Sequence, residues 1–212
     1  MDDHEQGELV RQWLRDNGAA ITTGIVIGLA GILGWQWWQH NQGQHRLDAA
    51  AMYQTLQQAA DTKDSATFEQ LAAELGSQFD NTPYGTLALL RLADEKAIQG
   101  DSDAAIAALN DAIRVAQSPA LTALARLRLA RVQLGAGNAQ GALDSLALIP
   151  AADYAGLAAE VRGDALLALD RRDEAGVAYQ DALSRLETGA PNRSIVEMKL
   201  ADLGVAITEP GV

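Results

Sequence analysis

The feature that most constrains this chain is a long uncharged stretch near its amino terminus. No Asp, Glu, Lys or Arg occurs between Asp16 and Arg46, and residues 18–38 are mostly apolar. A helix needs about 20 apolar residues to cross the roughly 30 Å of hydrocarbon in a bilayer. The rest of the 212-residue chain, which has a net charge of -12, contains no segment apolar enough to surround such a helix. The sequence therefore predicts a single transmembrane helix over residues 18–39.

A cleaved export signal or a buried helix of a soluble protein could also be apolar over this length. A signal peptide has a shorter apolar core and a small-x-small exit, whereas this stretch runs into Trp35, Trp37 and Trp38. These side chains, with Trp13 at the opposite end, resemble the aromatic belts at the two surfaces of a membrane. We therefore expect a permanent anchor, and a buried soluble helix stays the alternative.

The charges that flank the stretch predict its orientation. Arg11 and Arg15 lie on the amino-terminal side, whereas the first basic residue after the stretch is Arg46. Because Lys and Arg favour the cytoplasmic side, residues 1–17 are expected to form a cytoplasmic tail. Everything after the span would then be exported, beginning with a short linker at residues 40–46.

Small residues recur along one face of the predicted span. Such a pattern lets a second helix approach closely, although glycine is common in any membrane helix. A specific partner helix is therefore an open question at this stage. The candidate helix-contact residues are Ala20, Gly24, Gly28 and Gly31.

Residues 47–208 have the pattern of an all-α domain. Apolar residues recur at spacings of three and four, Ala and Leu dominate, and runs of β-branched residues are few. Ser65 and Asp103 are expected to cap two helix starts, and Gly100 and Gly137 suit left-handed stops. The predicted helices are 45–60, 65–79, 84–99, 103–117, 120–135, 139–149, 154–169, 173–187 and 194–207.

These helices form hairpins that repeat. The segments "GDSDAAIAAL", "GNAQGALDSL" and "DRRDEAGVAYQDAL" place Ala105, Ala142 and Ala175 at spacings of 37 and 33 residues. These spacings bracket the roughly 34 residues of a tetratricopeptide repeat. A small residue precedes each alanine by twelve positions and a larger one follows it by four, which lets the two helices of a hairpin pack closely. The small residues are Ala93, Ala130 and Gly163, and the larger ones are Leu109, Leu146 and Tyr179.

The predicted fold class is therefore all-α, with one transmembrane helix followed by a right-handed, tetratricopeptide-like solenoid of helical hairpins. A more degenerate hairpin, "AAAMYQTLQQAADTKDSATFEQLAAELGSQF", precedes the clear repeats. The last helix, "SIVEMKLADLGVA", would cap the stack. Residues 209–212 are expected to be a short tail.

Residues suited to catalysis are scarce. The chain has no cysteine, and its three histidines, His4, His40 and His45, lie in or beside the span. It has no phosphate-binding glycine loop and no G-x-S-x-G motif, and neighbouring carboxylates such as Asp94 and Glu95 point apart on a helix. The dispersed negative charge also argues against nucleic acid as a partner. We therefore expect a non-enzymatic protein with no cofactor and no metal site.

A binding surface is the better candidate for function. Tetratricopeptide stacks present the first helix of each hairpin along a concave groove, and leucine dominates the positions expected there. Such a groove suits apolar or amphipathic partner segments, or loosely held unfolded polypeptide. Some of these leucines could instead contact neighbouring helices. The candidate groove residues are Leu87, Leu90, Asp94, Leu124, Leu127, Arg131, Leu134, Leu157 and Asp164, with Glu160 and Leu167 on the same predicted face.

Several segments also carry a resemblance to a known family. "VRQWLRDNG", "GWQWWQ", "AAAMYQTL", "TPYGTLALLRLA", "ARLRLARVQLGAG" and "VRGDALLALDRRDEA" resemble YfgM-type proteins, which are ancillary subunits of the bacterial Sec translocon. The resemblance covers essentially the whole chain. It implies a single-pass inner-membrane protein with a periplasmic repeat domain, beside the SecYEG channel and a PpiD-type membrane-tethered chaperone.

Two hypotheses for function follow. The first is a translocon adaptor with a chaperone-like role, which binds secreted or unfolded polypeptides through the repeat groove. The second is a structural scaffold that tethers another envelope complex, such as the outer-membrane assembly or cell-division machinery, without binding clients. The two differ in whether denatured polypeptide is bound.

Overall fold

The structure, a computed structural model, describes residues 3–187 and 189–205. These residues form nine α-helices and no strand, so the all-α prediction is confirmed. The chain divides into two compact units with a boundary between Asp48 and Ala49. Helix α1, Asp3–Asp61, contributes to both units, and each unit is described by itself below.

The first unit consists of α1 up to Asp48. By length and composition, the described helix from Arg15 to Asp61 holds a stretch able to cross a membrane. Its most apolar window has a mean hydropathy of 1.7, and none of that window is buried. Ile25, Leu29 and Ile32 are each more than half exposed. An apolar amino-terminal helix suited to a membrane span is therefore confirmed.

Polar groups within this apolar stretch are satisfied inside the helix. The hydroxyls of Thr22 and Thr23 donate to the carbonyl oxygens of Gly18 and Ala19, each at 2.8 Å. Such internal hydrogen bonds remove the cost of placing a hydroxyl in hydrocarbon. Residues 40–46, where the sequence predicts a linker, are helical within α1.

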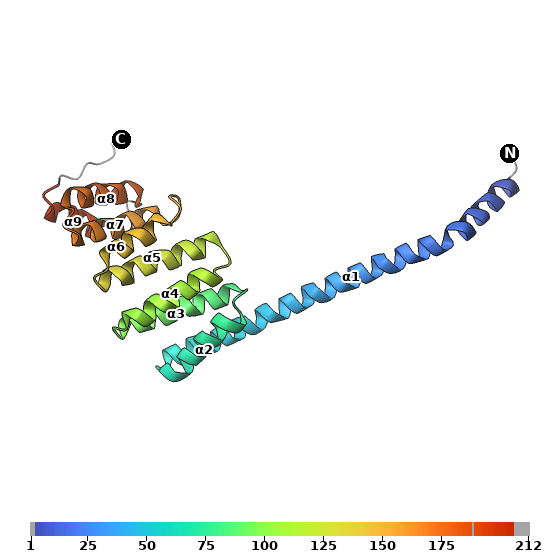
Figure 1. The fold of residues 1–212 in the computed structure, drawn as a ribbon, viewed down its shortest axis with the longest axis horizontal. Coiled ribbons are helices and arrows are strands. Elements are labelled where there is room, and N and C mark those ends of the chain that lie inside the picture. Colours follow the sequence, from blue (N-terminus) through green and yellow to red (C-terminus); the bar gives the residue numbers. More distant parts are fainter. Residues whose placement is uncertain (1–2, 188, 206–212) are drawn as a thin grey trace. The chain divides into compact units, whose positions relative to one another are not determined.

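The second unit, from Ala49 onward, is a stack of helical hairpins (Figure 1). The end of α1 packs on α2, α3 pairs with α4, α5 with α6, and α7 with α8. Each of α2, α4, α6 and α8 also contacts the next helix along the chain, so α9 packs on α8. The bounds are α2 Ser65–Gln78, α3 Pro83–Ile98, α4 Ser102–Val115, α5 Pro119–Gly135, α6 Ala139–Ala147, α7 Ala155–Ala168, α8 Arg172–Arg185 and α9 Arg193–Asp202.

Packing within the hairpins follows the predicted repeat positions. All nine residues that the sequence assigns to close helix contacts are buried. In the α7–α8 hairpin the small residue is Gly163, and a Cβ added there would lie 2.5 Å from Cδ1 of Tyr179. The glycine therefore makes room for the aromatic ring, as alanine makes room for leucine in the two preceding hairpins.

The turns inside the hairpins share one backbone conformation. Gly100 and Gly137 have φ values of +81° and +82°, which confirms them as left-handed stops. Lys63 and Asp170 take the same place in the other two hairpins, with φ values of 57° and 59°. Lys63 and Asp170 thus have a backbone conformation that favours glycine, although both carry side chains.

The predicted helix caps are displaced by one or two residues. The caps are Asp64 and Asp101, whose carboxylates accept hydrogen bonds from backbone amides three residues later, at 3.2 and 3.0 Å. Ser65 and Asp103 lie inside α2 and α4 instead. The reason is that the residue directly after the left-handed one becomes the cap, and the helix begins one residue later.

The last helix is shorter than predicted. Gly204 has a φ of +71°, and the amide of Val205 donates to the carbonyl of Leu200 at 3.2 Å, so α9 ends at Asp202. A left-handed glycine stops a helix in this way. The predicted end at 207, the domain end at 208 and the tail at 209–212 lie outside the described residues.

Candidate partner-binding site

The predicted groove residues lie on α3, α5 and α7, the first helices of three hairpins. Leu87 and Leu124 pack against the core that α3, α4 and α5 share, and both keep part of their surface exposed. Leu134 and Leu157 do the same at the core of α5, α6 and α7. These four leucines therefore stabilise the stack and also contribute to its surface.

Leu90 and Leu127 behave differently and correct the prediction. Their exposed fractions are 2% and 1%, and both belong to core clusters. Each lies three residues after a partly exposed leucine, and three residues fall about 60° short of a full helical turn. That rotation moves the side chain from the surface into the contact with the neighbouring helix, so neither leucine faces a partner.

The charged groove residues of α3 and α5 are exposed. Asp94 accepts a hydrogen bond from Nη1 of Arg128 at 2.6 Å, which joins α3 to α5. The two side chains are 49% and 32% exposed, so their ion pair contributes at most about 1 kcal/mol. Arg131, one turn further along α5, is exposed.

Sequence reasoning missed one prominent member of this surface. Ile98, at the end of α3, is 82% exposed and lies one turn after Asp94 on the same side of the helix. The four-residue spacing from Asp94 was the signal that could have identified it. We call the exposed part of this surface the first-helix face; it consists of Leu87, Asp94, Ile98, Leu124, Arg131, Leu134, Leu157 and Leu167.

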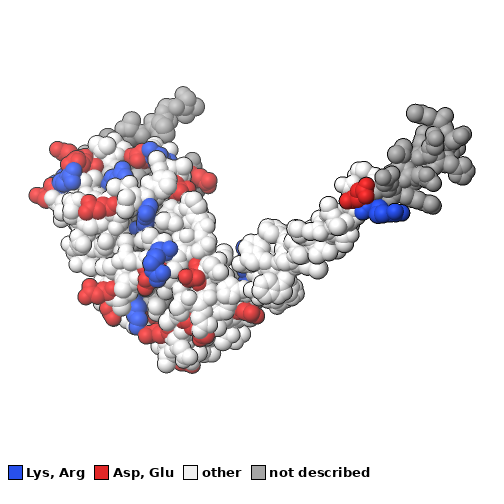
Figure 2. Space-filling model, turned by 45° about the vertical axis from the view of Figure 1, so that its right-hand side comes forward, with Lys and Arg blue, Asp and Glu red and all other residues white. Residues whose placement is uncertain are grey.

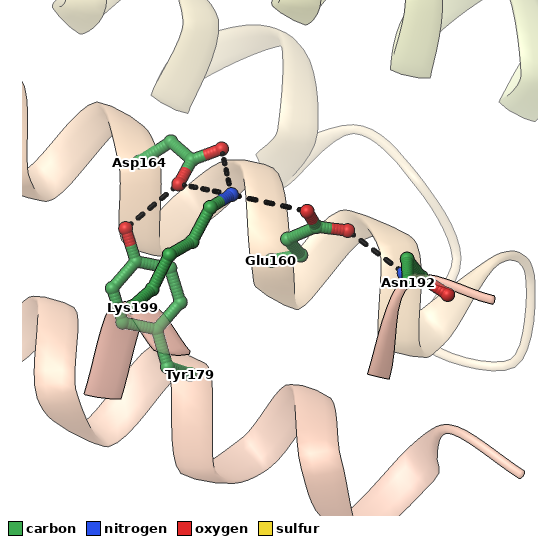
Figure 3. Close-up of polar contacts among 5 residues, drawn as sticks. All are labelled: Glu160, Asp164, Tyr179, Asn192 and Lys199. Carbon is green, nitrogen blue, oxygen red and sulfur yellow. Dashed lines mark hydrogen bonds and ion pairs between the residues drawn. The ribbon is translucent and has the colours of Figure 1, made fainter. Parts of the chain in front are cut away.

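At the carboxyl-terminal end of the stack, α9 covers the charged positions of α7 (Figure 3). Nζ of Lys199 lies 3.0 Å from Oε1 of Glu160 and 2.7 Å from Oδ1 of Asp164. The Asn192 amide donates to Oε2 of Glu160 at 2.8 Å, and the Tyr179 hydroxyl donates to Oδ1 of Asp164 at 2.7 Å. Asp164, which the sequence assigns to the partner groove, therefore holds α9 in place.

Two members of this cluster, Tyr179 and Lys199, have raised pKa values. Burial, the hydrogen bond to Asp164 and the charges of Asp164 and Glu160 all raise the pKa of Tyr179 above its ordinary 10.0. Partial burial lowers the pKa of Lys199, but the hydrogen bonds and charges of the two carboxylates outweigh it, so the pKa rises above 10.5. Both groups are protonated at neutral pH, and Lys199 also lies 5.7 Å from the centre of the Tyr179 ring.

Acidic and basic side chains are interspersed over the face of the second unit that Figure 2 shows. No large basic patch gathers among the described residues on that face. A nucleic-acid interface requires such a patch. This face therefore suits protein contacts better than phosphate backbones.

Comparison with known proteins decides the family. Residues 11–205 match the tetratricopeptide repeat-like domain family. The chain belongs to this family. The matched residues begin within α1, ahead of its apolar stretch, and continue past α9. The apolar stretch of α1 and the terminal helix are thus parts of the unit that the family shares.

Individual relatives of the same length give a more specific likeness. A protein of Escherichia coli named ancillary SecYEG translocon subunit is 28% identical over 203 residues, which are 96% of this chain and 97% of that protein. Proteins with the same name are 27% identical in Haemophilus influenzae and 26% identical in Neisseria gonorrhoeae, covering 96% and 94% of this chain and 98% and 97% of their own lengths. The resemblance to YfgM-type proteins is confirmed.

The small residues of the apolar helix lie at helical spacing within α1. A Cβ added at Gly24, Gly28 or Gly31 would meet no atom within 4 Å. The surface beside them, which includes Ala20, is therefore open to a second helix. Contact with such a helix stays a prediction.

Proposed function

We propose that this chain is an ancillary subunit of the Sec translocon, a membrane-anchored adaptor with a chaperone-like role. The observation that carries the proposal is the likeness, over 94–96% of the chain, to proteins named ancillary SecYEG translocon subunit. An apolar helix followed by a stack of binding repeats suits such a role, because it concentrates a protein-binding surface at the membrane.

In this proposal the chain is a single-pass protein of the bacterial inner membrane. Residues 1–17 are cytoplasmic and the repeat domain is periplasmic, which agrees with Arg11 and Arg15 on one side of the span and only Arg46 on the other. The absence of cysteine is compatible with either redox compartment, and it means that a cysteine introduced for labelling has no native thiol to compete with it.

Cysteine labelling tests this orientation. A cysteine at the exposed Ser184 of α8 should react with a membrane-impermeant maleimide in intact spheroplasts. A cysteine at Gln6 should react only after lysis. The opposite pattern would show that the domain is cytoplasmic and that the periplasmic proposal is incorrect.

The first-helix face is the proposed site for partners. It combines partly exposed leucines with Ile98, which is 82% exposed, and with the charges of Asp94 and Arg131. Apolar and amphipathic segments of secreted polypeptides match such a surface. The proposed partners are the SecYEG channel, a PpiD-type tethered chaperone and polypeptides that leave the channel.

The test is purification of the full-length chain from membranes in a mild detergent, followed by quantitative mass spectrometry. Channel subunits and a tethered chaperone should be recovered in constant ratio to the chain. Photocross-linking from the first-helix face should capture secreted polypeptides during translocation. Recovery of a different envelope complex without the channel would favour the scaffold hypothesis instead.

Matched variants connect the result to the face. Ile98→Asp should reduce cross-linking to secreted polypeptides, because it places a charge in the apolar surface. Val177→Asp, on α8, is the control, since Val177 is 67% exposed and lies outside the first-helix face. Equal cross-linking by the two variants would refute the role of this face in binding secreted polypeptides. The association with the translocon is tested separately, by the purification experiment.

A further inference from the structure

A second surface of the stack lies between α2 and α4, away from the first-helix face. It is a hollow of about 530 Å³. Ala73 and Gly76 of α2 form one wall, Ala104 and Ala107 of α4 form the other, and Leu89 and Leu92 of α3 form the floor. We call this hollow the α2–α4 groove.

Small side chains keep the α2–α4 groove open. A Cβ added to Gly76 would lie 2.9 Å from Cδ2 of Leu89, so glycine lets α2 rest directly on α3. Ala73 and Ala107 are exposed, and no long side chain projects from them into the hollow. The middle of the groove is therefore lined by methyl groups and leucine, and polar side chains complete the lining, namely Ser77, Asp80, Lys96, Asp111 and Arg114.

The helices that form the walls determine what can fill the groove. Backbone amides and carbonyls in the middle of α2 and α4 are already bonded within their own helices. An extended strand would find no edge to pair with and would bury unsatisfied backbone groups. A helix satisfies its own backbone, and alanine and glycine walls let its axis come within about 8–10 Å of its neighbours.

The charges at one end of the groove give the occupant its polarity. The carboxyl-terminal ends of α2 and α4 meet there, since Nε2 of Gln117 donates to the carbonyl of Asp80 at 3.0 Å. Helix carboxyl termini carry partial negative charge. Both cations of the lining are already paired, Arg114 with Asp111 at 2.9 Å and Lys96 with Glu69 at 2.6 Å, whereas the exposed Asp80 forms no ion pair with any described residue. This end of the groove is complementary to a positive charge.

We propose that the α2–α4 groove binds an amphipathic helix of a partner protein, with its apolar side on Leu89 and Leu92 and a basic residue next to Asp80. The occupant is a folded helix rather than an unfolded client. This inference goes beyond the proposed function, because it uses a different surface and a different class of ligand.

Two synthetic peptides test the proposal. Each has about 16 residues, close to the length of α2, with leucines on one side and glutamines on the other. One carries two arginines in its first turn and the other carries two glutamates there. Binding to the full-length chain in lipid nanodiscs is measured by fluorescence anisotropy, and empty nanodiscs give the lipid background. The arginine peptide should bind about fivefold more tightly than the glutamate peptide.

Two variants test whether the peptides bind in this groove and not elsewhere: one reverses the charge of Asp80, and the other fills the hollow with a larger side chain. Asp80→Arg should reverse the preference between the peptides. Ala107→Phe should weaken both by more than about tenfold, because the ring fills the hollow. Ala147→Phe, at an exposed alanine of α6, is the matched control and should leave binding unchanged. Circular dichroism checks that each variant is folded, and Ser77→Phe replaces Ala107→Phe if the latter unfolds.

The outcomes are decisive in both directions. Equal binding by Ala107→Phe and Ala147→Phe, or a peptide preference that Asp80→Arg leaves unchanged, would overturn the proposal. Ile98→Asp distinguishes it from the proposed function, since that change should not affect peptide binding. Loss of peptide binding in Ile98→Asp would place the peptide on the first-helix face instead.

Discussion

We expect Gly163→Ala to destabilise the fold, although the same change at an ordinary helix position is stabilising. In an exposed helix interior, replacing glycine by alanine stabilises by about 1 kcal/mol. Gly163 is buried in α7, and a methyl group there would lie 2.5 Å from Cδ1 of Tyr179. Carbon atoms in contact are normally separated by about 3.5–4.0 Å. Gly163→Ala therefore requires the ring or the helices to move by about 1 Å.

The surroundings of Tyr179 resist that movement. The residue is fully buried, and its hydroxyl is held by Asp164 at 2.7 Å. Overpacking of a core of this kind costs about 1–3 kcal/mol, and the short contact and fixed ring place this site near the upper value. Subtracting about 1 kcal/mol for the better helix propensity of alanine leaves a net loss of about 1–2 kcal/mol.

The other hairpins supply the compensating change. They pair alanine with leucine, as Ala93 with Leu109 in α3–α4 and Ala130 with Leu146 in α5–α6. In a Tyr179→Leu background, Gly163→Ala should therefore cost nothing or stabilise. The coupling between the two substitutions should be about 1–3 kcal/mol.

The assay is urea unfolding of the full-length chain in mild detergent, followed by circular dichroism at helix wavelengths. The span gives a constant background, because detergent preserves it. With a slope of about 2 kcal/mol/M, Gly163→Ala should lower the midpoint by about 0.5–1 M. If Gly163→Ala raises the midpoint equally in the Tyr179 chain and in the Tyr179→Leu variant, the Tyr179 ring is not the reason for glycine at position 163.

Four further substitutions have clear expectations. Val26→Lys costs about 2.5–3.5 kcal/mol at the centre of the span and should release the chain on carbonate extraction; retention would show that the span lies elsewhere. Because the pKa values of Tyr179 and Lys199 are raised, their stabilising contribution is complete below about pH 10 and falls as the pH rises further. Lys199→Met should therefore lose less stability above pH 10 than the unchanged chain does, as measured by the urea midpoint at each pH. Asp170 and Gly137 both have a left-handed backbone, which favours glycine. Asp170→Gly should therefore stabilise the fold by up to about 1 kcal/mol, and Gly137→Ala should destabilise it. Urea midpoints that shift in the same direction for both variants would contradict the left-handed assignment.

The helices and the hairpin register could be predicted from the sequence because several signals agree. The spacing of Ala105, Ala142 and Ala175 fixes the repeat, and Gly100 and Gly137 separate the helices within hairpins. Cap positions depend on a shift of one or two residues, which periodicity does not resolve. The end of α9 depends on Gly204, whose left-handed conformation is set by the local turn.

The partner-facing residues were harder to predict than the fold. A first helix in a stack touches a second helix of its own hairpin and the neighbouring hairpins, so it has packing contacts on most of its circumference. Hydrophobic pattern alone shows that Leu87 and Leu90 are apolar, but only the packing separates the half-exposed one from the buried one. Ile98 shows the converse, because an apolar residue in the last turn extends beyond the neighbouring helices.

The end of the stack shows why one predicted groove position in each hairpin is internal. Leu90, Leu127 and Glu160 each stand three residues before the small residue of their first helix, and all three are buried. Helix α9 packs on α8 as α5 packs on α4, so it occupies the place of another first helix. A leucine-rich helix in that place would bury the Glu160 carboxylate without a partner, which costs several kcal/mol. Lys199 supplies the partner at 3.0 Å, so the glutamate at this core position requires a helix with a basic residue here instead of another leucine-rich first helix.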